Sequence, residues 1–203
     1  MRSFLDVGSG DAEIPLPDYY AGWRRVRLDL DPSSKPDLLL DARKIGELPA
    51  AQFDAVYTSH NLEHFHRHEG RKVLAGCAHV LKPEGFIDIR VPDLGALMRA
   101  VVEKKMDIDD VAYQSDAGPI LVRDVIYGFH VEIERSGSDF YAHKTGFTEK
   151  SLGNFIREFF PFVLSTAGGD YELLAVGFKQ APSRQSLSLL GVSADVVEKL
   201  VRS

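Results

Sequence analysis

The stretch that decides the fold is Phe4-Leu5-Asp6-Val7-Gly8-Ser9-Gly10, a short apolar run that ends in two glycines. Nineteen positions after Gly10, Asp29 closes a second apolar run, Val26-Arg27-Leu28-Asp29. Glycine adopts positive φ angles and lets a ligand approach bare backbone, so the first run predicts a strand followed by a ligand-binding turn. An acidic residue at the end of the next strand is placed to accept hydrogen bonds from a ribose diol. We therefore expect a nucleotide-like ligand at the carboxyl edge of a parallel sheet.

The composition is that of an ordinary globular chain. Its 203 residues suit one domain, with 44% hydrophobic and 27% charged residues. The formal net charge of −6 makes nucleic acid an unlikely partner, because nucleic-acid binding usually needs a basic face. No apolar stretch is long enough to span a membrane, and the single cysteine, Cys77, forms no internal disulfide. We expect one domain over residues 1–203, cytoplasmic, and a monomer or a homodimer.

Hydrophobic periodicity and turn residues predict alternating strands and helices. Strands are expected at residues 3–7, 25–30, 37–40, 53–58 and 86–91, and helices at 69–81, 94–102, 152–160 and 194–201. Residues 162–167 and 172–178 form a hairpin around Gly168-Gly169-Asp170. The order predicts an α/β fold that is Rossmann-like and doubly wound, with a mostly parallel seven-stranded sheet and one antiparallel strand in the C-terminal hairpin.

Three segments depart from regular patterning. Pro15 and Pro17 allow only a short or broken helix between the first two strands. The strand at 86–91 carries Asp88 and Arg90 on one face, so we expect these to pair with neighbours or to meet an open cleft. Residues 104–147 are the least regular part and form an insertion, with a helix expected at 120–127 and a loop at 135–138.

Several motifs, in the right order and spacing, resemble those of class I S-adenosylmethionine-dependent methyltransferases. The segment from Leu5 to Gly10 resembles the first motif of the family, with Ala12 in place of a usual third glycine. Residues 53–57 and 59–65 resemble the fourth strand and the turn after it. Residues 80–86 resemble the turn before the fifth strand, with Glu84 in place of a glycine.

A subgroup of small bacterial methyltransferases of the type 11 kind fits better still. The chain has Arg90-Val91-Pro92-Asp93 after the fifth strand and a later His143-Lys144-Thr145-Gly146-Phe147-Thr148, and both resemble segments of that subgroup. The acceptors of that subgroup are mostly undefined. The resemblance therefore implies the fold and the cofactor, S-adenosyl-L-methionine, without naming the substrate.

The resemblance also implies which residues hold this cofactor. Asp29 matches the residue that binds the ribose, Asp41-Ala42 matches the position that faces the adenine amino group, and Asp6 lies near the methionine ammonium. The alternative for each of the three aspartates is a structural role, in which the side chain stabilises a turn or caps a helix. The full set expected to bind the cofactor is Asp6, Gly8, Ser9, Gly10, Asp29, Leu30, Asp41, Ala42, Ser59 and His60.

His60 is the first candidate for a catalytic group and His143 the second. The turn after the fourth strand borders the sulfonium in this fold, and a histidine there can take a proton from an acceptor hydroxyl or amine. His143 and Lys144 lie on a loop that can cover the acceptor, which we expect to be a small molecule. A dedicated base is optional, because the cofactor supplies the activation and the protein mainly aligns the reactants.

Other interpretations of these motifs stay open from sequence alone. The glycine turn and Asp29 also fit an NAD-dependent oxidoreductase, although Glu13 occupies the third glycine position of that fingerprint. A non-catalytic cofactor-binding module is a further alternative.

The segment His60-Asn61-Leu62-Glu63-His64 fits the inverted zinc-protease pattern, with Glu134 downstream as a third ligand. Some O-methyltransferases place a Glu-x-x-Glu-His metal site at this turn, and His60, Glu63 and His64 occupy the matching positions. Because a histidine replaces the first glutamate, we assign no metal ligands from the sequence.

Overall fold

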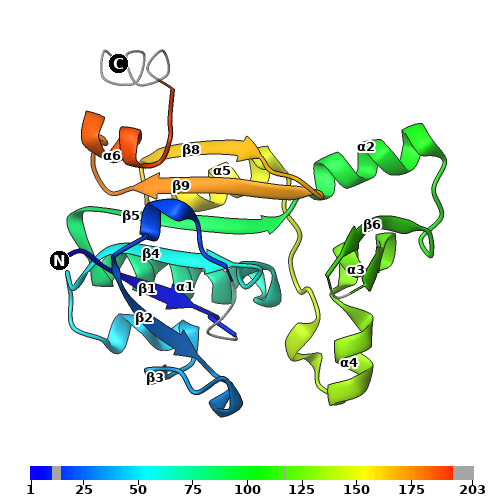
Figure 1. Ribbon diagram of the computed structural model, residues 1–203, viewed down its shortest axis with the longest axis horizontal. Helices are drawn as coiled ribbons and strands as arrows, with labels where there is room; N and C mark the ends of the chain where they lie inside the picture. Colours follow the sequence, from blue (N-terminus) through cyan, green and yellow to red (C-terminus); the bar gives the residue numbers. More distant parts are fainter. Residues whose placement is uncertain (11–14, 117, 194–203) are drawn as a thin grey trace.

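A seven-stranded sheet organises the molecule. The computed structural model describes residues 1–10, 15–116 and 118–193. The strand order is β3-β2-β1-β4-β5-β9-β8, with β5 and β8 each antiparallel to β9 and the other neighbours parallel (Figure 1). The strands are β1 Ser3–Val7, β2 Arg24–Asp29, β3 Leu38–Leu39, β4 Phe53–Ser59, β5 Leu81–Pro92, β8 Phe162–Ala167 and β9 Glu172–Phe178. This confirms the predicted α/β fold and its antiparallel C-terminal strand.

The main core lies between one face of the sheet and two helices. Helix α1 (Arg67–Val80) and helix α5 (Glu149–Arg157) turn their apolar stripes toward the strands, and Leu74, Cys77 and Phe155 are fully buried there. The 3-10 helix η3 (Ala42–Glu47) packs beside α1. Thr148 caps α5 as predicted, because its side chain accepts a hydrogen bond from Ser151 N.

The opposite face is covered by an aromatic turn rather than a helix. The only regular element described between β1 and β2 is the 3-10 turn η1 (Asp18–Tyr20), as the two prolines predicted. Tyr20 stacks on Phe4 with ring centroids 4.3 Å apart. The Tyr19 hydroxyl donates to Asp88 at 2.6 Å, so the buried polar residue of β5 pairs with this turn. The short helix α6 (Arg184–Leu189), which was not predicted, completes this face.

The insertion lies beyond the carboxyl ends of the parallel strands (Figure 1). It contains α2 Leu94–Lys104, β6 Val111–Ser115, β7 Gly118–Leu121, α3 Val122–Tyr127, α4 His130–Ser136 and the 3-10 turn η5 Asp139–Tyr141. It has its own small core, which includes Leu97, Val122 and Val125. The β6–β7 hairpin was not predicted, and the helix expected at 120–127 begins only at Val122.

One further sequence prediction needs correction. The loop expected at 135–138 is wrong at its start, since α4 runs to Ser136 and ends where Gly137 takes a left-handed φ of 62°. The helix predicted at 94–102 is confirmed as α2, and Met98 and Val102 on it are 57% and 77% exposed.

The start of β5 differs from its predicted position by a few residues, and two predictions concern residues outside the described part of the chain. β5 begins at Leu81, with a register irregularity against β4 where the turn 82–85 was expected. The helix predicted at 194–201 and the Ala12 position lie outside the described residues. No helix in the described part of the chain has the length and apolar character to cross a membrane.

Replacing Phe155 by alanine tests the main core. Phe155 is 1% exposed and stacks with Phe147, so Phe155→Ala is expected to lower the free energy of unfolding by about 3–5 kcal/mol. Denaturant unfolding followed by circular dichroism measures this. Phe162→Ala, at a position 42% exposed on β8, is the control and should cost about 1 kcal/mol or less. Equal losses in the two variants would contradict the packing described here.

Candidate functional site

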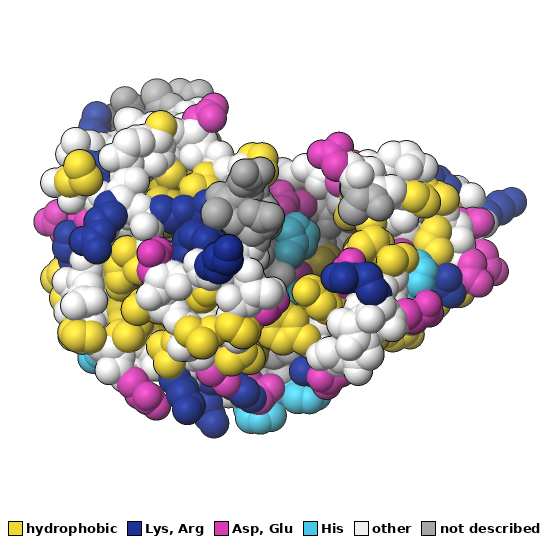
Figure 2. All heavy atoms as spheres, turned by 60° about the horizontal axis from the view of Figure 1, so that its bottom comes forward, with side chains coloured by type: hydrophobic (Ala, Val, Ile, Leu, Met, Phe, Trp, Pro, Cys, Tyr) yellow, Lys and Arg dark blue, Asp and Glu magenta, His cyan; other side chains and the backbone are white. Residues whose placement is uncertain are grey.

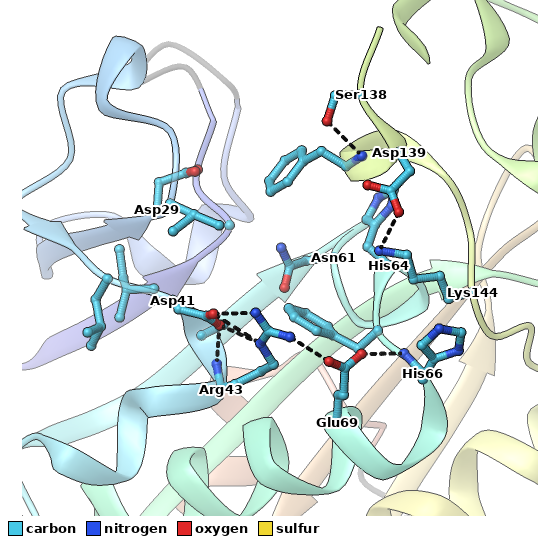
Figure 3. Close-up of a pocket in the computed structure, with 17 residues that line it drawn as sticks. Asp29, Asp41, Arg43, Asn61, His64, His66, Glu69, Ser138, Asp139 and Lys144 are labelled. Carbon is cyan, nitrogen blue, oxygen red and sulfur yellow. Dashed lines mark hydrogen bonds and ion pairs between the residues drawn. The ribbon is translucent and has the colours of Figure 1, made fainter. Parts of the chain in front are cut away.

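A crevice of about 300 Å³ lies at the carboxyl ends of β1, β2 and β4. Gly8, Asp29 and Asp41 form one side of it, and the segment from Ser138 to Lys144 forms the other. Asn61 projects between the two sides (Figure 3). In the space-filling view the surface is hollowed between the sheet and the insertion, and histidine side chains show at this hollow (Figure 2). The crevice brings together the predicted residues Gly8, Asp29, Leu30, Asp41 and Ala42.

The glycine turn is shaped by close contact with Asn61. Gly8 has a φ of +71°, and a Cβ placed there would lie 2.1 Å from Asn61 Nδ2. Only glycine fits without displacing the asparagine. Asn61 Oδ1 is buried and accepts no hydrogen bond from any described residue. An unsatisfied acceptor beside bare backbone suits a polar ligand, and Asn61 is a site residue that sequence analysis missed.

Asp29 stabilises the glycine turn and can still accept hydrogen bonds from a ligand. Its two oxygens accept hydrogen bonds from Gly10 N at 2.8 Å and from Asp31 N at 2.9 Å. Each carboxylate oxygen has a second lone pair, so both can accept a further hydrogen bond. Asp29 is 5% exposed and lines the crevice. Its position at the end of β2 therefore fits the prediction that it accepts hydrogen bonds from a ribose diol.

Asp41 both caps a helix and lines the crevice. Its side chain accepts from Arg43 N at the start of η3, and the Arg43 guanidinium bridges it to Glu69 (Figure 3). Hydrogen bonding from Arg43 lowers the pKa of the Asp41 carboxyl below its usual value. The carboxylate thus stays ionised, with its position fixed by the arginine.

Five predicted cofactor residues do not line the crevice. Asp6 is buried and paired with Arg25 at 2.6 Å, so its carboxylate serves the β1–β2 pair. Ser9 is buried with an unpartnered hydroxyl, and Ser59 ends β4 without facing either of the two larger cavities at this edge. Gly10 lines a smaller neighbouring hollow, together with Asp29 and His60.

A second cavity of about 280 Å³ adjoins the crevice on the side of the insertion. Aromatic and apolar side chains dominate its walls, including Tyr113, Ile120 and Phe129. His60 and His143, the two predicted catalytic residues, both line it. His64 lines the crevice and the second cavity alike, so it stands at their boundary.

His60 is held by two carboxylates. Its backbone takes a left-handed φ of 47°, and its Nε2 lies 3.1 Å from Glu172 Oε1 while its Nδ1 lies 3.5 Å from Glu63 Oε1. Burial opposes the charged form, but these two ion pairs outweigh it and raise the pKa of His60 to about 10. A histidine in this state is an imidazolium at neutral pH, which makes it unsuited to accept a proton.

His143 differs from His60 in its charge state. It is largely buried, and its Nδ1 lies 3.2 Å from the carbonyl oxygen of Val125. Burial lowers the pKa of His143, so the ring is neutral at physiological pH. With Nδ1–H donating to the carbonyl, Nε2 keeps its lone pair and faces Glu63 Oε1 at 4.0 Å.

The inverted-protease interpretation is wrong. That motif needs a long helix to place both histidines, whereas Leu62–His64 is a single 3-10 turn after β4. Glu134 is exposed on α4, and it is not one of the neighbouring side chains Glu63, His64 and His143, whose nitrogen and oxygen atoms lie close together at this turn.

The sequence of residues 5–89 matches the family model described as a methyltransferase domain. This match covers the glycine turn, Asp29, Asp41 and the turn after β4, which line the crevice together with the unmatched segment from Ser138 to Lys144. Residues 5–89 therefore have the sequence pattern of a methyltransferase domain. No curated protein is similar enough in sequence to be matched with the chain.

Solved structures share the fold at low sequence identity. A Pyrococcus horikoshii protein is 17% identical with a TM-score of 0.56, over 89% of this chain and 83% of its own. A SAM-dependent methyltransferase from Archaeoglobus fulgidus is 17% identical with a TM-score of 0.50, over 99% and 80%. An O-methyltransferase family protein from Burkholderia thailandensis is 16% identical with a TM-score of 0.53, over 88% and 51%. Likeness at this level establishes the fold of the methyltransferase.

Changing one carboxylate of the methyltransferase crevice should weaken cofactor binding. Asp29→Asn keeps the shape of the side chain but removes the charge, and a hydrogen bond to a charged group contributes about 1.5–3 kcal/mol. We expect the Kd for S-adenosylhomocysteine, measured by calorimetry, to rise roughly tenfold or more. Asp37→Asn, an exposed carboxylate just before β3, is the control and should bind as the parent does. Unchanged affinity in Asp29→Asn would remove Asp29 from the binding site.

Proposed function

We propose that this methyltransferase acts on a small-molecule acceptor held in the second cavity. The observation that carries the proposal is the position of His64, which lines both this cavity and the crevice. A ligand in one space is therefore the immediate neighbour of a ligand in the other. A volume of about 280 Å³ with aromatic walls suits a small organic molecule rather than a polymer.

The residues of the crevice fit the cofactor. Asp29 offers carboxylate lone pairs to a ribose, Gly8 leaves backbone open, and Asn61 Oδ1 supplies an unused acceptor. When bound, S-adenosylmethionine supplies an activated methyl group, which an acceptor takes by in-line displacement. The contribution of the protein is to hold both partners side by side and to exclude water, which is worth roughly 7–11 kcal/mol for well-oriented reactants.

The two predicted catalytic histidines receive different roles in this proposal. His60 is paired with Glu63 and Glu172 as a cation, so we assign it to fixing the β9 end of the site rather than to proton abstraction. His143 presents a neutral imidazole nitrogen beside Glu63 in the wall of the acceptor cavity. In this scheme Ser9, Ser59 and Asp6 stabilise the glycine turn without lining the crevice.

The strand order argues against the oxidoreductase alternative. Dinucleotide-binding sheets of the Rossmann type have the order 3-2-1-4-5-6. Here β9 is inserted antiparallel between β5 and β8, which are themselves parallel to the rest. The motif at Asp41-Ala42, which has no part in the oxidoreductase fingerprint, also lies at the crevice.

We place the protein in the cytoplasm as part of the same proposal. Its one cysteine, Cys77, is a free thiol buried in the main core, as a reducing compartment permits. A monomer or a homodimer remains our expectation, to be checked by light scattering on the purified protein. Nucleic acid is disfavoured as acceptor by the net charge of −6.

Transfer of labelled methyl groups to fractionated extract tests the acceptor class. The protein is incubated with S-adenosylmethionine labelled in the methyl group and with either the low-mass or the macromolecular fraction of a bacterial lysate. We expect label in the low-mass fraction. Ile120→Trp, which fills the second cavity, should reduce this transfer at least tenfold without changing the affinity for S-adenosylhomocysteine.

Val111→Trp is the matched control, since Val111 is 45% exposed on the other strand of the same hairpin. It should transfer label as the parent does. Label confined to protein or nucleic acid would contradict a small acceptor. Cofactor binding with no transfer to either fraction would instead favour a non-catalytic binding module.

A further inference from the structure

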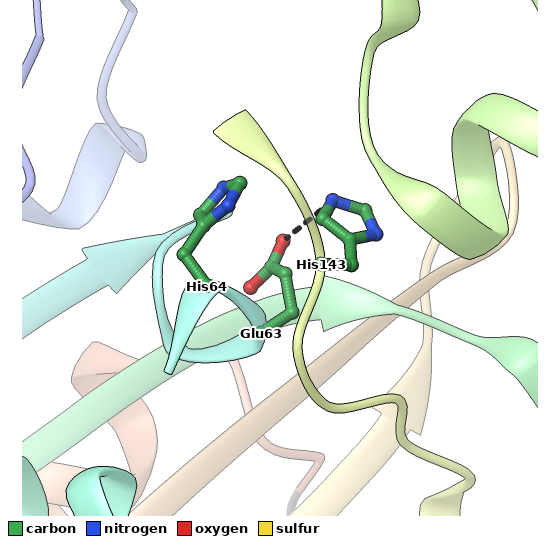
Figure 4. A group of neighbouring side chains, drawn as sticks. All are labelled: Glu63, His64 and His143. Atoms are coloured by element: carbon green, nitrogen blue, oxygen red, sulfur yellow. Dashed lines mark ion pairs between the residues drawn. The ribbon is translucent and has the colours of Figure 1, made fainter. Parts of the chain in front are cut away.

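The geometry points to a metal site at the turn after β4, with His143, which no motif of the sequence indicates as a ligand, in place of His60. We infer that Glu63, His64 and His143 bind a divalent transition-metal ion at the boundary of the crevice and the acceptor cavity. Glu63 and His64 come from the turn after β4, and His143 comes from the segment that closes the site, about 80 residues later. The Glu63 carboxylate lies between the two imidazole rings (Figure 4).

The ligand atoms are already close to one another. One ligand atom from each of the three side chains lies within 4.8 Å of the other two, and His143 Nε2 is 4.0 Å from Glu63 Oε1. Two ligands of a tetrahedral zinc ion are separated by roughly 3.4 Å, given metal–ligand bonds of about 2.1 Å. The three ligand atoms must therefore draw closer together when an ion binds.

Both histidines are oriented as metal-binding histidines usually are. His64 Nδ1 donates to the carbonyl oxygen of Ala142 at 3.2 Å, and His143 Nδ1 donates to that of Val125 at 3.2 Å. Hydrogen bonds of this kind fix the tautomer and leave Nε2 free to coordinate. The two rings meet edge to face with centroids 5.1 Å apart, which directs them to the same small space.

The burial of the Glu63 carboxylate without hydrogen bonds is an independent observation that indicates a bound cation. Glu63 is 1% exposed, and neither of its side-chain oxygens forms a hydrogen bond with any described residue. A buried carboxylate without hydrogen bonds is costly unless a cation balances it. His60 Nδ1 lies 3.5 Å away and compensates only in part, because its other nitrogen is engaged with Glu172. A bound cation satisfies both oxygens.

The backbone holds the two halves of the site together. Lys144 N and Thr145 N both donate to the carbonyl oxygen of Glu63, at 2.8 and 3.1 Å. The Thr145 hydroxyl donates to the carbonyl oxygen of Phe65 at 2.8 Å. His143 is therefore fixed opposite Glu63 by main-chain hydrogen bonds that do not need the ion. Such a preformed site loses little entropy when it binds.

The donor set selects the kind of metal. Two imidazole nitrogens and one carboxylate oxygen suit zinc, manganese, iron or cobalt, whereas magnesium and calcium prefer oxygen ligands throughout. Three protein ligands leave coordination positions for water or substrate. The site is thus of the open kind that serves catalysis.

The location suggests what the ion does, and this role rests on the proposed function. An acceptor hydroxyl in the second cavity, which His64 and His143 line, can occupy an open position on the ion. The ion would lower the pKa of a bound hydroxyl, so that its proton passes to solvent water; the resulting oxygen would form a bond to the methyl carbon as the bond from that carbon to sulfur breaks, releasing S-adenosylhomocysteine.

Titration of the metal-free protein with cobalt tests binding without any need for an acceptor. After treatment with a chelator and removal of it, we expect one Co²⁺ per chain, with visible absorption bands of a mixed nitrogen and oxygen site. Zn²⁺ should compete for the same site. Glu63→Gln and His143→Asn should each weaken Co²⁺ binding at least tenfold, while circular dichroism reports whether they remain folded.

His68→Asn is the matched control, because His68 is exposed in the same sequence region and lies outside the cluster. It should bind Co²⁺ as the parent does. His64→Asn, at a partly exposed position, replaces Glu63→Gln if that variant does not fold. Binding that is absent from the parent protein, or equal in the control and the cluster variants, would overturn the site. Calorimetry with S-adenosylhomocysteine on the same samples shows separately whether the cofactor crevice is intact.

Discussion

The backbone of Glu63 is the point on which the functional architecture depends. Its carbonyl oxygen accepts hydrogen bonds from Lys144 N and Thr145 N, which ties the turn after β4 to a segment about 80 residues away. Without these two hydrogen bonds, no segment would cover the sheet at the carboxyl end of β4. With them, the segment 138–145 becomes the outer wall of the crevice and separates it from the acceptor cavity. One main-chain contact therefore creates two adjoining spaces, as transfer between two bound molecules requires.

The charges at this contact are unusual for a structural turn. Burial acts to raise the pKa of Glu63, but the neighbouring histidines, His60 foremost, outweigh it and lower the pKa below its ordinary value. The result is an ionised carboxylate beside His60, which is held as a cation, and His143, whose pKa burial lowers. A fold that needed only stability would gain by replacing such a group with apolar side chains. Its presence at the junction of two cavities is more readily explained by function.

What the sequence predicts well is what local patterns encode. The hairpin 162–167 and 172–178, the glycine turn and Asp29 follow from period, turn residues and spacing, and the structure has them where expected. Asn61 was missed, because its contact with Gly8 joins separate strands and leaves no signal in either segment. The roles of Asp6 and His60 depend on partners distant in the chain, Arg25 and Glu172, which no local motif reveals. The β6–β7 hairpin escaped prediction because its short strands lack a clear alternating pattern.

The central claim is that the edge formed by Gly8, Asn61 and Asp29 binds the adenosyl part of the cofactor, next to the cluster at Glu63. A crystal structure with S-adenosylhomocysteine tests it most directly. The account predicts the ribose hydroxyls within hydrogen-bonding distance of Asp29, and the sulfur on the side of His64 that faces the acceptor cavity. A ligand bound elsewhere, with the crevice above Gly8 closed by side chains of the protein, would contradict it.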